Sequence, residues 1–247
     1  MIVRNRVLRR MMLGSAAIAV LTVFTAANSF AQDAGGAATE IDASAVPDLG
    51  KSVKDFVPKG WKLEEDVKGD LNQDGIIDHA LKLIEDRPAA EKDEFVDLSR
   101  ALVIVFGGKG GLVRAAVAGK ILQCTACGGA FYGVMPAPAN VSIANGVLTV
   151  MNDHGSRWVT EVTYKFRYDA RPGMFILIGF DYVSRDRAEG SVTSESTNYL
   201  TGKRIMTTGK GRRTTTKNST VAKDRHSIES VDTEQWESDA TTRLGLD

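Results

Sequence analysis

The segment Gly69–Asp78 (GDLNQDGIID) constrains the fold of this chain most, because it places acidic and amide side chains in a single tight loop. Counted from its first aspartate, oxygen-bearing side chains stand at positions 1, 3, 5 and 9 and a glycine stands at position 6, which is the spacing of a calcium loop. Three carboxylates so close together repel one another unless a cation neutralises them, although Asp and Asn are also ordinary turn formers. The spacing predicts one Ca²⁺ bound by the side chains of Asp70, Asn72, Asp74 and Asp78 and by the backbone carbonyl of Ile76.

Strand patterns lie on both sides of this loop and dominate the chain after it. Ala101–Phe106 is a continuous apolar run, as in a strand that is buried on both faces. Asn145-Gly146 predicts a tight hairpin, and Trp158–Tyr168 alternates aromatic with polar residues, as a half-buried strand does. We therefore expect an all-β fold of antiparallel meander sheets in one domain over 46–220, with the calcium loop at 70–78.

One short N-terminal helix is expected ahead of the strands. It opens at Asp48, and Pro58 and Gly60 end it. Four apolar residues within it have the i, i+4, i+7, i+8 spacing of one helix face: Leu49, Val53, Phe56 and Val57.

The first 31 residues have the parts of an export signal. Arginines precede the apolar run Met11–Ala27, and Ser29-Phe30-Ala31 places small residues where a signal peptidase cleaves. The run is shorter than the roughly 20 residues of a membrane span, and no cysteine follows the cleavage point as in a lipoprotein. Arg9-Arg10 leaves the twin-arginine route open beside the general one. We expect a signal peptide over 1–31, a flexible linker over 32–45, a periplasmic or secreted location, and no transmembrane span after cleavage.

The charge balance argues against nucleic acid as a partner. The chain has 31 basic and 31 acidic residues, and removal of the signal takes four arginines away, so the mature protein is mildly acidic. One stretch, 203–217, is locally basic: Lys203, Arg204, Lys210, Arg212, Arg213 and Lys217. We interpret this stretch as a charged, solvated sheet edge, with binding to an anionic surface as the alternative. Residues 221–247 are expected to form one more edge strand and a loose C-terminal tail, with Trp236 as a lone anchor.

The two cysteines, Cys124 and Cys127, stand in C-x-x-C spacing. In an exported protein this spacing predicts a disulfide, a local staple worth about 2 kcal/mol. A thioredoxin-like redox pair would need a helix starting at the first cysteine, which Gly128-Gly129 opposes. A zinc site would need two more ligands, whereas the three histidines are scattered along the chain.

Catalytic residues are not identifiable from the sequence. Asp153-His154, with Arg157 close by, has the residue types of acid–base chemistry, but no nucleophile with a partner accompanies them. Exposed loop residues explain the same pattern. A deep cleft with convergent histidine and carboxylate groups would favour an enzyme, and a flat surface would favour a binding protein.

The loop and its flanks resemble a known repeat. The residues from Val67 to Asp78, with strands on both sides, look like the FG-GAP or VCBS-type repeat of integrin-like β-propellers, in which the same positions bind calcium inside a hairpin. Phe56–Trp61, the loop, and Cys124–Gly129 together resemble a group of uncharacterised exported bacterial proteins. The resemblance implies a propeller-blade-like sheet. Because this chain has one such loop where a propeller has several, we expect one blade-like sheet merged with a second meander.

These features together predict an exported calcium-binding β protein with a structural or binding role at the cell envelope. The expected partner is an envelope protein or a polysaccharide, and the expected cofactor is Ca²⁺. The alternative is an envelope enzyme, a hydrolase or a thiol oxidoreductase.

Overall fold

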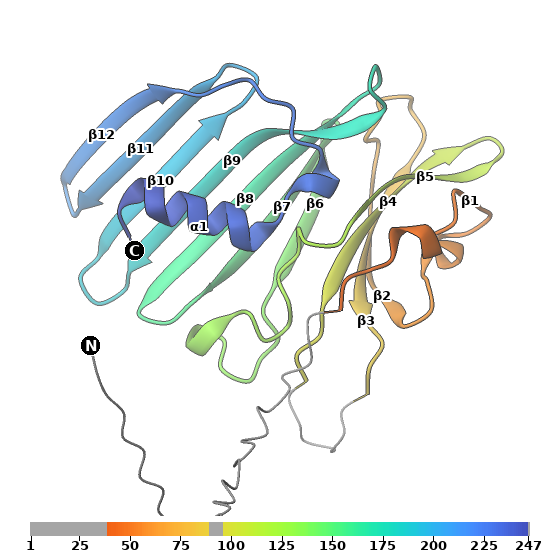
Figure 1. The fold of residues 1–247 in the computed structure, drawn as a ribbon, viewed down its shortest axis with the longest axis horizontal. Helices are drawn as coiled ribbons and strands as arrows, with labels where there is room; N and C mark the ends of the chain where they lie inside the picture. The colour runs from red at the N-terminus through yellow and green to blue at the C-terminus, as the bar shows by residue number, and fades with distance from the viewer. Residues whose placement is uncertain (1–38, 89–95, 247) are drawn as a thin grey trace, which may run out of the picture. The chain divides into compact units, whose positions relative to one another are not determined.

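The computed structural model describes residues 39–88 and 96–246. The predicted signal peptide and the first part of the predicted linker lie outside these residues. Two antiparallel β-sheets form the body of the described chain, and one α-helix follows them (Figure 1). The all-β prediction with antiparallel sheets is confirmed.

The first sheet has five strands in the order β1-β5-β4-β3-β2. Its strands are β1 (Leu49–Gly50), β2 (Trp61–Gly69), β3 (Asp78–Glu85), β4 (Arg100–Gly108) and β5 (Gly111–Ala118). The central strand β4 is buried on both faces, as its continuous apolar run predicts, and Ala101–Val105 is fully buried. One face packs against Phe56 and Trp61, and the other belongs to the larger core shared with the second sheet.

The second sheet is a seven-stranded meander in which each strand pairs with the next along the chain. Its strands are β6 (Ala139–Ala144), β7 (Val147–Gly155), β8 (Trp158–Asp169), β9 (Met174–Asp186), β10 (Ser191–Asn198), β11 (Lys203–Lys210) and β12 (Arg213–Thr220). The hairpin predicted at Asn145-Gly146 is present: both residues have positive φ, 52° and 71°, and they join β6 to β7.

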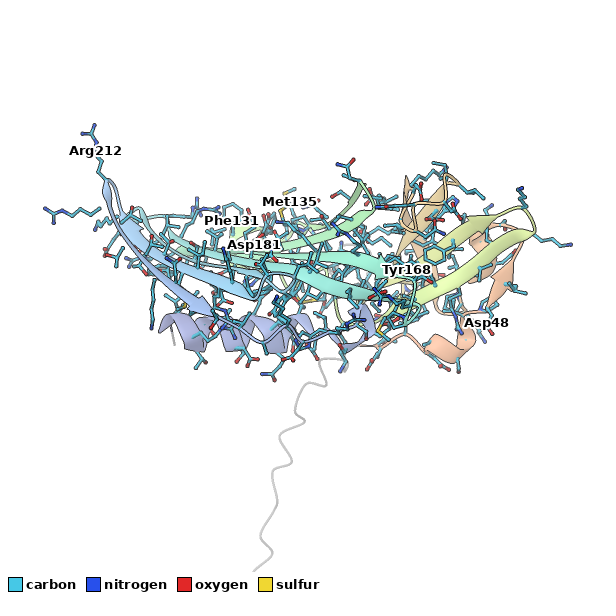
Figure 2. The ribbon with its side chains drawn as sticks, turned by 90° about the horizontal axis from the view of Figure 1, so that it is seen from above. Asp48, Phe131, Met135, Tyr168, Asp181 and Arg212 are labelled. Atoms are coloured by element: carbon cyan, nitrogen blue, oxygen red, sulfur yellow. A yellow bond between two sulfur atoms is a disulfide. The ribbon has the colours of Figure 1, made fainter. Side chains whose placement is uncertain are left out.

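The C-terminal segment differs from the expected edge strand and loose tail. Thr233–Leu244 forms the helix α1, which covers one face of the second sheet (Figure 1). Asp181 lies on the other face of this sheet, and its side chain points away from the helix (Figure 2). Asp232 caps the first turn by accepting hydrogen bonds from the backbone N–H groups of Glu234 and Gln235. Gly245 ends the helix in the left-handed conformation, at φ 66°.

The helix forms because the sheet buries its apolar side. Trp236, Ala240 and Leu244 recur every four residues and pack against the core. The Trp236 ring lies 5.5 Å from the ring of Phe180 and 6.4 Å from that of Tyr164, centre to centre. Trp236 is therefore an anchor, as expected, but it belongs to a helix.

The N-terminal lead-in is more ordered than its composition suggests. Where the linker prediction covers 39–45, Ile41 is buried and Ala43–Ala45 forms the short 3₁₀ helix η1. The predicted N-terminal helix is present as the 3₁₀ helix η2 (Val53–Phe56). It is shorter than expected because Leu49–Gly50 instead pairs with Leu112 and Val113 of β5. The strand pairing of Leu49–Gly50 and the burial of Phe56 stabilise this arrangement more than a longer helix with the same apolar spacing would.

Candidate functional site

The predicted calcium loop connects β2 to β3 at the junction of the two sheets. Gly69 and Asp78 face each other across the loop as the last pair of the β2–β3 ladder. Gly75 has φ 82°, which a glycine adopts without strain. A Cβ at Gly107 of β4 would lie 2.2 Å from the Ile77 carbonyl oxygen, and one at Gly146 would lie 2.4 Å from Gln73 Nε2. The loop therefore touches both β4 and the β6–β7 turn.

Three of the predicted ligands lie together in this loop. Asp70 accepts hydrogen bonds from the backbone N–H groups of Asp74 (3.2 Å) and Gly75 (3.0 Å). Asn72 Oδ1 accepts from the same Asp74 N–H at 3.0 Å, and Asn72 Nδ2 donates to Asp74 Oδ2 at 3.1 Å. Asp74 Oδ1 accepts from Ile76 N–H at 2.8 Å. The loop amides thus hold Asp70, Asn72 and Asp74 around one short turn.

Asp78, the fourth predicted side chain, points into the protein. It is completely buried and accepts three backbone hydrogen bonds, from Leu71 (2.7 Å), Asn72 (3.3 Å) and Gly107 (2.9 Å). Burial raises the pKa of the Asp78 carboxyl, and these three hydrogen bonds act in the opposite direction. Asp78 therefore fastens the loop to β4.

The loop carries negative charge without a basic partner. Among the described residues, no lysine, arginine or histidine forms an ion pair with Asp70, Asp74 or Asp78. In the same part of the chain, no three His, Cys, Asp or Glu side chains are grouped as they would be around a metal ion. The predicted set also draws on an amide and a backbone carbonyl, and a site made only of oxygens has the chemistry that Ca²⁺ prefers.

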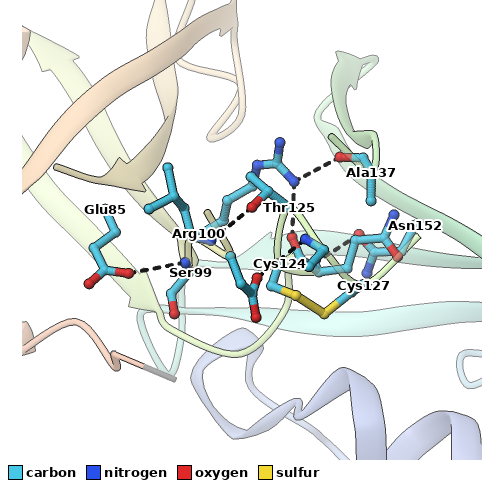
Figure 3. The surroundings of a disulfide bond; sticks show 12 residues. Glu85, Ser99, Arg100, Cys124, Thr125, Cys127, Ala137 and Asn152 are labelled. Carbon is cyan, nitrogen blue, oxygen red and sulfur yellow. Dashed lines mark hydrogen bonds between the residues drawn. A yellow bond between two sulfur atoms is a disulfide. The ribbon is translucent and has the colours of Figure 1, made fainter. Parts of the chain in front are cut away.

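The two cysteines form the predicted pair. The Cys124 and Cys127 sulfurs are 2.00 Å apart and the Cα atoms 5.1 Å apart. Between them, Thr125 is buried, and it exchanges hydrogen bonds with Leu98 and receives one from Ala137 N–H at 2.8 Å. Figure 3 shows the disulfide beside Arg100, whose guanidinium donates to the Ala137 carbonyl at 2.8 Å. A short 3₁₀ helix, Gly129–Phe131, follows the pair, and the surrounding strands are antiparallel rather than arranged in a βαβ unit.

A cavity of about 610 Å³ lies beside this disulfide. Five segments of the chain build its wall: the lead-in at Thr39, the start of β4, the connection from β5 to the disulfide, the end of β7, and the first turn of α1. The wall contains five carboxylates, namely Glu40, Asp97, Asp232, Glu234 and Glu237. Because these residues are far apart in the sequence, no local motif indicates the cavity.

The basic residues in the wall are already paired. Arg100 is buried, and it donates two hydrogen bonds to Glu64, at 2.8 and 2.9 Å, besides those to backbone carbonyls. Lys120 lies 3.4 Å from Asp232 and 3.9 Å from Glu40. The wall therefore keeps an excess of negative charge.

His154 lines the cavity and pairs with α1. Its Nε2 lies 2.7 Å from Glu237 Oε2, and this hydrogen bond raises the pKa of His154 against the opposing effect of burial. The structure separates His154 from the two residues grouped with it in the sequence: Asp153 accepts from the Tyr132 hydroxyl, and Arg157 pairs with Asp186 at 2.6 Å. No Ser, Thr or Cys side chain described in the structure is hydrogen-bonded to His154.

Gln123 is one of several wall residues that the sequence patterns do not indicate. Its side chain is almost fully buried, and Nε2 donates to the carbonyls of Pro138 and Asp153. Its Oε1 is buried without a hydrogen-bond partner, the one such side-chain atom among the described residues. In the sequence, the sign that Gln123 is buried is its position between the apolar pair Ile121-Leu122 and the first cysteine.

The chain matches no protein-family model, no curated protein and no solved structure. The stretches with described coordinates contain no helix with the length and apolar character needed to cross a membrane.

Proposed function

We propose that this chain is an exported, calcium-stabilised binding protein of the cell envelope. The observation that carries the proposal is the loop at 70–78, where Asp70, Asn72 and Asp74 surround one turn and no described basic side chain balances their charge. The export signal over 1–31 and the Cys124–Cys127 disulfide support a periplasmic or secreted location, since disulfides persist in oxidising compartments.

Calcium has a structural role in this proposal. Asp70, Asn72 and Asp74, with the Ile76 carbonyl, would hold the ion from the solvent side, and Asp78 would complete the set from the buried side. The bound ion supplies positive charge that offsets the repulsion between the carboxylates. Because the loop touches both β4 and the β6–β7 turn, ordering the loop would stabilise the contact between the two sheets.

The binding role is supported by the cavity beside the disulfide. Its volume of about 610 Å³ falls in the range of small-ligand sites, and polar groups from five segments converge on it. An envelope protein or a polysaccharide remains the proposed macromolecular partner.

The test of calcium binding is the melting temperature with and without the ion. Calcium at about one hundred times its dissociation constant should add about 2.7 kcal/mol to the free energy of unfolding and raise the melting temperature by several degrees. Magnesium should act weakly, since it demands tighter geometry and keeps its waters. Asp74→Ala should remove most of the calcium-dependent shift. The matched control is Asp224→Ala, which removes an equal charge from an exposed position and should leave the shift intact.

A wild-type melting curve that does not respond to calcium or to a chelator, together with no heat of calcium binding in calorimetry, would contradict this proposal. The loop would then be a turn whose amides alone hold its carboxylates.

A second candidate, an envelope hydrolase, is favoured by one observation. The His154–Glu237 pair lines a cavity and has the arrangement of a base oriented by a carboxylate. Water or a group of the substrate would have to act as the nucleophile. Hydrolysis of simple aryl esters that is lost in His154→Gln would favour this candidate, and rates at background for the folded wild-type protein would oppose it.

A further inference from the structure

The second sheet ends on one side in an open edge strand. β12 pairs with β11 alone, and the register of this pair has no bulge from Lys210–Arg213 to Lys203–Thr220. Residues 213–218 are all exposed, and Figure 1 shows β12 as the outermost strand of this sheet. An edge strand of this length presents a row of backbone groups with which a further strand can pair.

The other sheet edges are covered, short or interrupted. β6, at the opposite edge of the second sheet, contacts the first sheet, where Lys82 Nζ donates to the Ala139 carbonyl at 3.1 Å. In the first sheet, β1 has only two residues, and β2 has a bulge between Leu63 and Glu65. Covering, short strands and bulges keep an edge from pairing with another chain. β12 has none of these protections.

Alternate residues of β12 direct their backbone groups outward. The Val221 N–H donates to the Gly202 carbonyl at 2.9 Å, at the end of the β11–β12 ladder. Hydrogen-bonded and non-hydrogen-bonded pairs alternate along an antiparallel ladder, so Thr214, Thr216 and Asn218 fall at non-hydrogen-bonded positions. Their N–H and C=O groups therefore point away from β11, and no described group forms a hydrogen bond with them.

The open edge carries positive charge on one face. Glu195, Met206 and Lys217 are paired in one row across three strands, so the Lys217 side chain lies on the face that α1 covers. Arg213, four residues earlier, lies on the same face. Neither cation forms an ion pair with a described residue, and the sequence has no acid between Glu195 and Asp224. The edge therefore repels a second copy of itself and attracts a strand with acidic side chains.

We propose that β12 binds an extended acidic segment of a partner protein, which joins the second sheet as an additional antiparallel strand. The backbone of the segment pairs with Thr214, Thr216 and Asn218, and two carboxylates four residues apart pair with Arg213 and Lys217. Main-chain hydrogen bonds supply the affinity of such a complex, and side chains supply its selectivity. The inference rests on the binding role proposed above and gives it a protein partner, but it uses neither the calcium loop nor the cavity.

The experiment is a titration of the ¹⁵N-labelled mature protein with the capped peptide acetyl-TETTTET-amide. In an antiparallel register its two glutamates face Lys217 and Arg213, and its third and fifth residues face Thr216 and Thr214. We expect the amide signals of Thr214 and Thr216 to shift saturably and their hydrogen exchange to slow. The amide signals of β6 should stay unchanged.

Two matched peptides separate strand pairing from charge. N-methylation of the third and fifth threonines keeps both glutamates but removes two N–H donors, and it should weaken binding at least about tenfold. Replacing both glutamates with glutamine should weaken binding by about fivefold, because two exposed ion pairs are lost. Unchanged binding of the N-methylated peptide would overturn the inference. Binding of a heparin oligosaccharide as tight as that of the peptide would also overturn it, because the edge would then select anions without regard to strand pairing.

Four protein variants locate the binding. Thr216→Pro removes an outward N–H and leaves the β11 ladder intact, so it should keep the melting temperature and lose most peptide binding. Thr216→Val keeps this N–H and should bind as the wild type does. Lys217→Gln should weaken binding about threefold, whereas Lys109→Gln, at the exposed β4–β5 turn, should leave it unchanged. If Thr216→Pro does not fold, the N-methylated peptide provides the same test on the wild-type protein.

Three outcomes would contradict the proposal on the protein side. The first is the absence of any saturable shift in β12, and the second is normal peptide binding by a folded Thr216→Pro variant. The third is dimerisation that competes with the peptide, which would assign the edge to a second copy of the chain. Calcium titration keeps the two proposals apart: peptide binding without a calcium response contradicts only the calcium proposal, and a calcium response without peptide binding contradicts only this one.

Discussion

Each sheet buries carboxylates, and the most deeply buried one of each, Asp78 in the first sheet and Glu195 in the second, is held in a different way. Asp78 of the first sheet is 0% exposed, and its described partners are three backbone N–H groups. Glu195 of the second sheet is 1% exposed and is held by two arginines. Arg243 Nε and Nη2 donate to Glu195 at 2.8 and 3.0 Å, and Arg204 Nε lies 3.1 Å from it.

The difference follows from what each carboxylate has to connect. Asp78 joins a loop to the neighbouring strand β4, and backbone amides are available at that distance. Glu195 joins three elements, since Arg204 comes from β11 and Arg243 from the last turn of α1. The long side chains of Arg204 and Arg243 reach Glu195 from these elements, and their positive charge offsets the cost of burying its carboxylate. Arg204 belongs to the stretch that we interpreted from the sequence as a charged, solvated sheet edge, yet it pairs with a buried carboxylate. We call the ion pairs of Glu195 with Arg204 and Arg243 the arginine clamp.

The largest effect is expected from breaking the arginine clamp. Arg243→Met should lower the free energy of unfolding by about 3 kcal/mol, because it leaves a buried carboxylate short of a partner. Urea unfolding measures the loss. Arg225→Met is the control, since Arg225 pairs with Asp169 at the surface with its side chain 59% exposed and should cost less than about 1 kcal/mol. Adding Glu195→Gln to Arg243→Met should recover part of the loss; no recovery would show that packing, and not the bare charge, is responsible.

Replacing Asp78, the carboxylate held by backbone N–H groups, should lower the free energy of unfolding by a smaller amount. Asp78→Asn turns a donor toward backbone N–H groups and should cost about 2 kcal/mol of unfolding free energy. Urea unfolding in the presence of chelator excludes any contribution from calcium. Asp224→Asn, an exposed change of the same kind, should have no measurable effect. Equal stability of the two variants would mean that the loop does not depend on Asp78.

The His154–Glu237 pair is a further polar contact that attaches α1 to the second sheet, and this one responds to pH. The pKa of His154 is raised above its ordinary value of 6.5, mainly by Glu237 and with a contribution from Asp153. Its contribution to stability is therefore fully present below about pH 6.5 and declines as the pH rises through the folded-state pKa. His154→Gln should cost about 1 kcal/mol in mildly acidic buffer and less in alkaline buffer. A cost that does not change with pH, in urea titrations of both proteins, would contradict this assignment; Glu237→Gln should abolish the dependence.

The smallest effect is expected at the exposed end of the second sheet. Arg212 and Arg213 lie at the β11–β12 turn, and Figure 2 shows Arg212 projecting from it. Replacing both with Ser should change the free energy of unfolding by less than about 0.5 kcal/mol and should weaken retention on heparin at low salt, where screening is least. A large loss of stability would place these arginines with Arg204 in the clamp.

Local patterns predicted the features of this protein that depend on neighbouring residues. The run Ala101–Phe106 gives the buried strand β4, Asn145-Gly146 gives a hairpin, and Cys124 and Cys127 form a pair across three positions. The turn at 70–78 is also formed by local interactions, because most of its hydrogen bonds join residues at most seven positions apart. The Asp232 cap and the glycine after α1 were local signals as well, but the polar composition of the tail concealed them.

The tertiary structure alone decided where charge is buried and where a cavity lies. Arg204 looks like a surface cation in the sequence, and only the packing of α1 on the second sheet makes it a partner of Glu195. Glu237 meets His154 across 83 positions, and Gln123 becomes a buried, unpaired acceptor only when the two sheets and the helix come together. Hydrophobic periodicity and turn chemistry act over a few residues, whereas the neighbours of a buried polar group are set by the whole packed core.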